Sequence, residues 1–317
     1  RYYVTTGTPA QVIERYTKLT GRAPVPPKWA LGYQPSRWGY RTEAAVVDTV
    51  QKFEELDLPL SAVHTDIDVQ LGYRAFTIDP QRFPNTQEFM QSLLEKGVRF
   101  ITIINPGIKY SCDSNLFLEG QLLNLFCQRP DGKPVVAPVW PGWCVFPDFT
   151  NPKAPHWWSR QYEYLLDLGV SGFWHDMNEP AAFIAWGDRS LPPKATLHDM
   201  EGRGGDHREA HNVYVYLQAK AAYESLCSYR SYLRPFIVSR AGWAGLHRYA
   251  WSWTGDIECT WECLKITIPM LLNLGLSGIP YSGPDIGGFQ GNPSAELYLR
   301  WFQLATFVPF YRSHCSN

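Results

Sequence analysis

Short apolar runs alternate with amphipathic helical patterns from Trp29 to the end of the chain. An apolar run bounded by Gly, Pro or polar residues is typical of a buried strand. Eight such runs predict strands at Ala30–Tyr33, Ala62–Thr65, Arg99–Ile104, Gly172–Trp174, Pro235–Val238, Ala250–Trp253, Gly278–Tyr281 and Phe307–Tyr311. Because strand and helix alternate, the pattern indicates an α/β fold with a parallel sheet, and eight repeats favour a (β/α)8 TIM barrel.

Helix start signals follow two of the predicted strands. Thr42 precedes a segment in which Val46 and Val50 share one helical face, so we expect Thr42 to be the N-cap. Thr86 is likewise expected to cap a helix over Gln87–Lys96. These helices would cover the outside of the barrel.

The connections between the predicted strands are unequal in length. Residues 106–154 and 181–211, after the third and fourth strands, are rich in Gly, Pro and polar residues, as inserted active-site loops are. The segment between Val238 and Ala250 is too short for a full crossover helix. The sequence therefore predicts a barrel with two inserted loops and an irregular fifth unit.

Composition excludes several classes of partner. The 29 Lys and Arg residues are balanced by 30 Asp and Glu, so we expect no binding to nucleic acid or to an anionic membrane surface. The longest apolar stretch, 266–281, is interrupted by Asn, Ser, Gly and Pro and predicts no membrane span. Aromatic residues make up 15% of the chain, and a Trp-rich polar pocket suits sugars.

The seven cysteines are an odd number without a Cys-x-x-Cys pair, so neither a disulfide framework nor a zinc ribbon is predicted. Cys259 and Cys263 lie four residues apart, but no further metal ligands lie near them in the sequence. Free thiols are typical of a reducing compartment, and no targeting signal is visible in the sequence, so we expect a cytoplasmic location.

Polar residues follow the predicted strands at the ends where barrel enzymes place catalysis. They are Arg37, Asp66, Asp68, Asn105, His175, Asp176, Asn178, Glu179, Arg240, Asp256, Asp285, Arg312 and His314. Glycoside hydrolysis requires two carboxylates that flank the scissile bond, and aromatic faces stack on sugar rings. Asp176 and Asp256, each close behind a Trp, fit that requirement.

Two other classes of function compete with this interpretation. The acidic strand ends could hold Mg²⁺ or Ca²⁺ in a metal-dependent hydrolase, but no loop with calcium-type spacing accompanies them. His64, Asp66 and Asp68 alternate along one strand end, which is a poor cage for a metal. We therefore expect no metal and no other cofactor. A carbohydrate-binding protein on a decayed hydrolase barrel would have lost one of the two carboxylates, and both are present.

Several motifs make the chain resemble the glycoside hydrolase family 31 α-glucosidases and α-xylosidases. The segment Phe173-Trp-His-Asp-Met-Asn-Glu-Pro180 resembles the nucleophile signature of that family, and Trp253-Thr-Gly-Asp256 resembles its acid/base segment. Further similar segments are Trp140–Gly142, Phe149–Pro152, Ile237–Arg240, Gly283–Phe289 and Arg312–His314. The resemblance implies a retaining, exo-acting α-glycosidase, foremost an α-glucosidase, in which Asp176 is the nucleophile and Asp256 the acid/base. An α-xylosidase or an α-glucosyltransferase would use the same residues.

The resemblance also implies the residues that bind the sugar, an α-linked oligosaccharide or glucoside. They are Asp66, Ile67, Ile103, Trp140, Trp174, Met177, Arg240, Trp253, Asp285, Phe289, Arg312 and His314. His175, Asn105 and Ile257 depart from the pattern of most family members, which bears on sugar preference. The pKa of Asp256 should exceed that of Asp176, whose charge a nearby Arg240 would favour.

The same resemblance suggests a domain organisation. Residues 1–28 are expected to be a lead-in segment that joins a missing N-terminal β-domain, because the run Ala-Pro-Val-Pro-Pro cannot continue a helix. Residues 29–317 are expected to be the catalytic (β/α)8 barrel, truncated at strand 8. The sequence indicates no oligomeric state.

Overall fold

Eight parallel strands form the centre of the protein in a computed structural model that describes residues 2–185 and 189–316. Their order is β12-β11-β10-β7-β3-β2-β1-β13. Ile286, just beyond β12, donates its backbone N–H to the carbonyl of Arg312 in β13 at 3.1 Å, which nearly closes the ring. The predicted TIM barrel is confirmed. The bounds are β1 Gln34–Arg37, β2 Ala62–Thr65, β3 Arg99–Ile104, β7 Gly172–His175, β10 Ile237–Ser239, β11 Trp251–Trp253, β12 Ser282–Gly283 and β13 Arg312–Cys315.

The predicted strand positions are correct for some strands and shifted for others. β2 and β3 have the predicted bounds, whereas β1, β12 and β13 begin several residues later than predicted. The apolar run taken for the first strand is a 3-10 helix, η1 (Lys28–Leu31), and β1 begins at Gln34. Gln34 is fully buried and contacts His64 Nε2 at 2.8 Å. The strands that begin later than predicted, β1, β12 and β13, consist largely of polar or small residues. A search for apolar runs therefore places them too early in the sequence.

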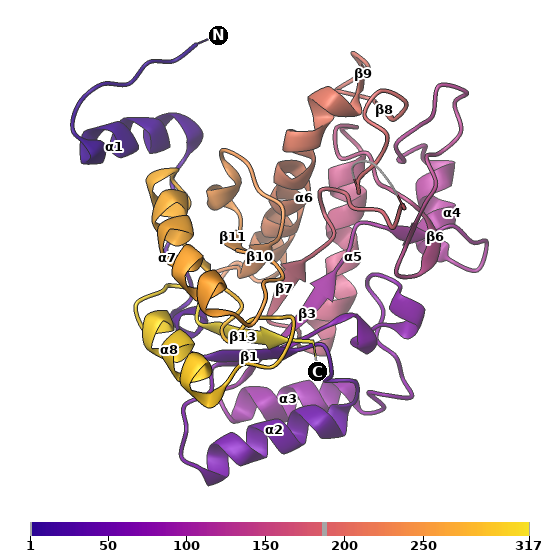
Figure 1. Ribbon diagram of the computed structural model, residues 1–317. Helices are drawn as coiled ribbons and strands as arrows, with labels where there is room; N and C mark the ends of the chain where they lie inside the picture. The colour runs from indigo at the N-terminus through magenta and orange to yellow at the C-terminus, as the bar shows by residue number, and fades with distance from the viewer. Residues whose placement is uncertain (1, 186–188, 317) are drawn as a thin grey trace.

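Helices surround the sheet, as Figure 1 shows, and a further helix, α1, precedes the barrel. Their bounds are α1 Pro9–Thr20, α2 Glu43–Glu55, α3 Thr86–Glu95, α4 Asn115–Leu122, α5 Ala154–Leu168, α6 His207–Tyr229, α7 Trp261–Leu276 and α8 Ala295–Ala305, with 3-10 helices η2 Ile67–Val69, η3 Leu71–Tyr73 and η4 Leu246–Arg248. Thr42 caps α2 as predicted, accepting from the N–H of Ala45 at 3.2 Å. The prediction for Thr86 was wrong, because it is the first helical residue and its hydroxyl donates to Phe83. Among the described residues, no helix is long and apolar enough to span a membrane.

Both predicted inserts are present. The first carries α4 and a small antiparallel sheet of β4 (Ile108–Lys109), β6 (Gly142–Val145) and β5 (Ala137–Val139). The second carries the hairpin β8 (Leu197–His198) and β9 (Gly205–Asp206) before α6 begins. The fifth unit is irregular as expected, since the described chain between β10 and β11 forms only η4.

The inside of the barrel is apolar at one end and polar at the other. Phe236 and Phe310, just before β10 and β13, pack with Ile101 in an inner cluster at the amino ends of the strands. The ring centroids of the two Phe residues lie 6.2 Å apart. This plug leaves the carboxyl ends of the strands to polar side chains, where a site can form.

Candidate active site

Arg240 joins two strand ends of the barrel. It follows β10, and its Nη1 lies 2.9 Å from Oδ1 of Asp176, the predicted nucleophile after β7. The same guanidinium donates from Nε and Nη2 to the two carboxylate oxygens of Glu179, at 3.0 and 2.8 Å. A guanidinium held by two carboxylates has little freedom to move, so it fixes the position of the Asp176 carboxylate.

A buried ion pair lies at the floor of the barrel mouth. Arg312 donates to Asp285 at 2.7 Å, and both side chains are fully buried. The Arg312 guanidinium lies over the rings of Trp174 and Trp253, 4.6 and 5.1 Å from their centroids. Aromatic faces stabilise a cation that has lost its water. The strand ends of β7, β11 and β13 thus share one charged floor.

His314 forms the next part of the floor. Its Nδ1 lies 2.8 Å from the hydroxyl of Ser36, and its Nε2 lies 3.7 Å from Oδ2 of Asp66. Its ring stacks on Phe289 at 4.8 Å. Polar atoms of Asp256, Asp285 and His314 lie within 4.8 Å of one another. Asp256, the predicted acid/base, is the exposed member of this group and therefore stands at the rim.

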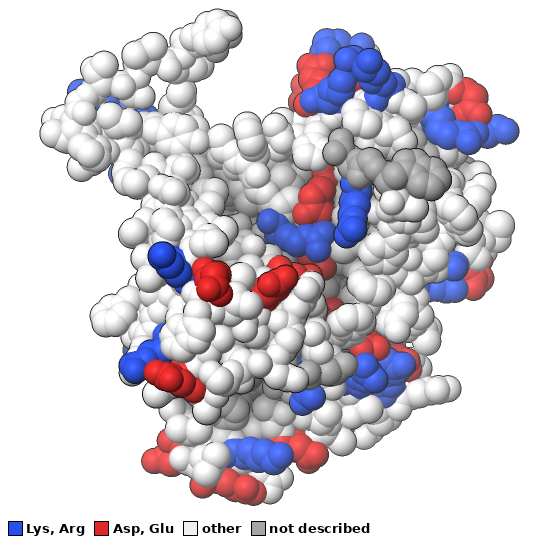
Figure 2. Space-filling view, viewed as in Figure 1, with Lys and Arg blue, Asp and Glu red and all other residues white. Residues whose placement is uncertain are grey.

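A cleft of about 860 Å³ includes Asp256 among its lining residues. Its other lining residues include Trp140, Met177, Glu179 and Arg240. The start of α6 adds His207, His211 and Asn212. Figure 2 shows basic and acidic side chains gathered side by side near the middle of this face. Another cavity, of about 760 Å³, lies near the amino ends of β3 and β10 and contains none of the predicted site residues.

Burial dominates the ionisation of the carboxyl groups. It raises the pKa of Asp66 to about 8 and that of Asp285 to about 7, although Arg312 favours the charged form of both. Burial raises the pKa of Asp176 to about 6 against the lowering effect of Arg240. Although the side chain of Asp256 reaches solvent, the loss of water contacts beside the buried groups raises its pKa, and the charges of Arg240 and Arg312 act in the opposite direction. Arg240 is as close as predicted, but its charge does not outweigh burial, so the pKa of Asp176 lies above its usual range.

Several buried polar atoms at the barrel mouth lack a hydrogen-bond partner among the described residues. They are the indole nitrogens of Trp174 and Trp253, Oδ2 of Asp285, Nε and Nη1 of Arg312, and both amide atoms of Asn105. Each unpaired buried group costs about 1–3 kcal/mol. Hydroxyl groups, which both donate and accept, are one kind of partner for such atoms.

The other predicted residues fall into two groups. Ile67 and Ile103 are buried in the inner cluster with Trp174 and Trp253 and support the floor. His175 points out of the barrel, since successive strand residues face opposite sides, and its Nε2 lies 2.9 Å from the hydroxyl of Tyr162 in α5. His175 therefore does not contact the cleft through this ring nitrogen, and its departure from the family pattern concerns packing.

Sequence reasoning missed part of the cleft. Glu179 holds Arg240 but was left out of the predicted binding residues. His207, His211 and Asn212 come from a helix rather than from a strand end, so the barrel rule did not select them. A sequence signal for this part of the cleft was the helix N-cap Asp206, whose side chain accepts from the N–H of Arg208 at 3.0 Å. This cap marks the start of α6, where the second insert returns to the barrel.

Comparison with known proteins identifies the family. The profile of the "Glycosyl hydrolases family 31 TIM-barrel domain" matches residues 23–317, and the chain belongs to glycoside hydrolase family 31. It is 44% identical over 316 residues to "Alpha-glucosidase 2" of Bacillus thermoamyloliquefaciens, which covers 99% of this chain and 40% of that protein. The chain thus spans less than half of that relative.

Solved structures agree with this assignment. The glucosidase II alpha subunit in its alpha3-Glc2-bound form superimposes with a TM-score of 0.92 at 34% identity, over 98% of this chain and 34% of that one. A family 31 alpha-glucosidase from Bacteroides thetaiotaomicron superimposes with a TM-score of 0.87 at 36% identity, over 98% of this chain and 50% of that one.

Proposed function

We propose that this chain carries the catalytic site of a retaining α-glucosidase that removes glucose from the non-reducing ends of α-glucosides. The observation that carries the proposal is the 2.9 Å ion pair of Asp176 with Arg240, since Arg240 lines one cleft together with Asp256. The floor is closed by fully buried residues, which suits a single terminal sugar and so an exo-acting enzyme. The α-glucosidase names of its relatives favour glucose as that sugar.

The mechanism has two displacements. Asp176 attacks the anomeric carbon while the bond to the leaving oxygen breaks and Asp256 donates a proton to that oxygen. A covalent glycosyl ester on Asp176 results. Asp256 then takes a proton from water, the water oxygen attacks the anomeric carbon, and the ester bond to Asp176 breaks. Two inversions leave the product in the α configuration.

Arg240 supports the attack through Asp176. Its positive charge lowers the pKa of Asp176, which must be ionised to attack. Asp256 must hold a proton in the first step, and its raised pKa suits that task. Because the exposed Asp256 stands at the rim, it can reach the leaving oxygen and, later, a water molecule.

The remaining predicted residues receive roles in the same proposal. Asp66, Asp285, Arg312 and His314 pair with sugar hydroxyls, since each is buried and polar. The apolar and aromatic residues shape the pocket for one sugar ring, with Ile67 and Ile103 packed behind it. The walls are Trp140, Trp174, Met177, Trp253 and Phe289.

A panel of 4-nitrophenyl α-glycosides tests the proposal. We expect 4-nitrophenol release from the α-glucoside to exceed that from the α-xyloside and α-galactoside. NMR during the first minutes should show α-glucose before mutarotation, because the mechanism retains configuration. Initial β-glucose would overturn the mechanism, and preference for the xyloside would overturn the sugar. Cleavage of maltose releases the reducing-end glucose in either case, so one free glucose per maltose cleaved together with a trisaccharide would indicate a transferase, whereas two free glucose molecules indicate hydrolysis.

A further inference from the structure

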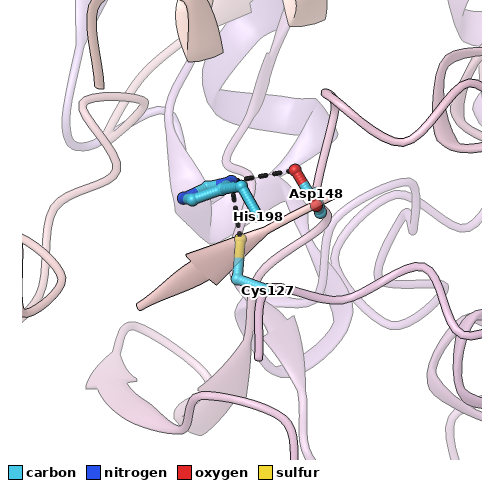
Figure 3. Close-up of side chains that lie close together, drawn as sticks. All are labelled: Cys127, Asp148 and His198. Atoms are coloured by element: carbon cyan, nitrogen blue, oxygen red, sulfur yellow. Dashed lines mark hydrogen bonds and ion pairs between the residues drawn. The ribbon is translucent and has the colours of Figure 1, made fainter. Parts of the chain in front are cut away.

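A buried hydrogen-bonded relay joins the two inserts to the start of α6. Figure 3 shows His198 of β8 between Asp148, which follows β6, and the thiol of Cys127. His198 Nδ1 lies 2.8 Å from Oδ1 of Asp148, and His198 Nε2 lies 3.0 Å from Nδ1 of His207, the first residue of α6. Asp148, His198 and His207 are all less than 5% exposed, which makes the relay a part of the interior.

The hydrogen-bond donors around Asp148 determine which ring nitrogens of His198 and His207 carry a hydrogen. Asp148 accepts from the backbone N–H of Thr150 and of Asp199 and from the Thr150 hydroxyl. Burial raises the pKa of Asp148, but these bonds and His198 outweigh burial, and the net pKa is lowered. The carboxylate therefore accepts the Nδ1 hydrogen of His198, and His198 Nε2 accepts the Nδ1 hydrogen of His207.

This order leaves Nε2 of His207 as an acceptor. Burial, helped by His198 and His211, lowers the pKa of His207 to about 4, so the ring is neutral near pH 7. Nε2 is buried and has no hydrogen-bond partner among the described residues, although His207 lines the cleft. An unpaired acceptor beside a cleft is a place for a ligand hydroxyl.

The position of His207 in the cleft indicates which part of the ligand it would meet. The cleft is lined by Asp256 and Arg240 at the barrel mouth and by His207, His211 and Asn212 from α6. The buried residues that would hold the sugar being transferred, Asp66, Asp285, Arg312 and His314, are not among the lining residues of this cleft. The α6 side therefore faces the group that Asp256 protonates, which is the leaving group.

We propose that the first turns of α6 form the leaving-group side of the site. A hydroxyl of the displaced sugar donates to His207 Nε2, and His211 and Asn212 contact the same sugar. Asp148 and His198 are positioning residues, because they act only by orienting His207. This inference rests on the proposed function and adds the chemistry of the leaving group to it, namely a hydroxylated sugar.

Two substrates with the same glucosyl group separate this inference from the proposed function. α-Glucosyl fluoride has no leaving sugar, whereas nigerose, maltose and isomaltose do, and the disaccharide that is cleaved fastest is used. His211→Ala should lower kcat/KM for the disaccharide about tenfold, the effect of one lost hydrogen bond, with less than a twofold change for the fluoride. His207→Asn, whose amide can still donate to His198 but has no counterpart of Nε2, should show the same selective loss. Glu209→Ala is the matched control in the same turn, since Glu209 is exposed and pairs with Arg203 rather than lining the cleft.

The positioning role has its own readout. Asp148→Asn should raise KM for the disaccharide and leave both kinetic constants for the fluoride near wild type. Equal losses on both substrates, or no loss on either, would overturn the inference, as would a wild-type protein that cleaves the fluoride but none of the disaccharides. Failure of the wild-type protein to cleave the fluoride would instead refute the proposed function. Because His211 is exposed, His211→Ala should fold even if a relay variant does not.

Discussion

Replacing Asp256 distinguishes an acid/base from a structural carboxylate. Asp256→Asn keeps the size and the hydrogen-bonding capacity of the side chain but cannot deliver a proton. We expect kcat/KM for maltose to fall about 10²- to 10⁴-fold, the usual contribution of a general acid. α-Glucosyl fluoride, which needs no protonated leaving group, should still form the covalent intermediate on Asp176 at close to the wild-type rate.

The structure gives the expected effect on stability. The alternative role for Asp256 is to cap the following helix, but Thr260 caps α7, accepting from the N–H of Cys263 at 3.2 Å. Because Asp256 is exposed and its pKa is raised in the folded protein, Asp256→Asn should leave the free energy of unfolding at neutral pH unchanged or higher. Thr260→Ala, in contrast, should cost about 1 kcal/mol and leave the kinetics unchanged.

Rapid-mixing kinetics and urea unfolding measure the two effects. With an activated aryl α-glucoside, Asp256→Ala should give a burst of phenol followed by slow turnover, because the second step still needs a base. The bell-shaped pH profile of kcat/KM should lose its alkaline limb in the variant. If Asp256→Asn cleaved maltose at near the wild-type rate, the assignment would be wrong, and Asp285 and Asp66 would be the next candidates.

Three further predictions concern the other carboxyl groups. Asp176→Ala should abolish hydrolysis, and azide should restore turnover to give a β-glucosyl azide by mass spectrometry and NMR; an α-azide would contradict the assignment. The acid limb of kcat/KM should lie near pH 6, and Arg240→Gln should move it to higher pH because the charge that lowers the pKa of Asp176 is removed; an unmoved limb would contradict this. Asp66→Asn should be more stable than wild type in urea unfolding, by an amount that grows from about pH 4 to pH 8; a constant difference would refute the raised pKa of Asp66.

The accuracy of the strand predictions depended on whether the side chains of the strand are apolar core residues or polar residues of the site. β2 and β3 carry apolar side chains such as Val63 and Ile101, which pack in the core, and their bounds were predicted without error. β13 consists of Arg312, Ser313, His314 and Cys315, because its residues build the floor of the site. A periodicity argument assigns such a polar segment to a loop. The displaced prediction of β13 therefore falls where the strand contributes residues to the candidate site.

Candidate site residues could be predicted only where topology determines their position. The carboxyl ends of barrel strands meet at one face, so Asp176, Arg240 and Asp285 could be placed together from their order in the chain. No comparable rule says where an insert returns to that face. The contribution of α6 depends on how the β8–β9 hairpin folds onto Asp148, and that is a matter of long-range hydrogen bonds rather than of local pattern.

The raised pKa of Asp66 follows from the same burial that would make it selective for a sugar. In the folded protein the Asp66 carboxyl keeps its proton up to about pH 8, whereas in the unfolded chain it loses the proton near pH 4. Between these values the folded state binds more protons, so the free energy of unfolding falls as the pH rises, by about 1.4 kcal/mol per pH unit for one such group. Asn at this position has no proton to lose and can retain the oxygen that accepts from the N–H of Ile67 at 2.7 Å. The gain in the free energy of unfolding of Asp66→Asn at pH 8 thus measures how much stability the wild-type protein loses by keeping an ionisable group at this buried position.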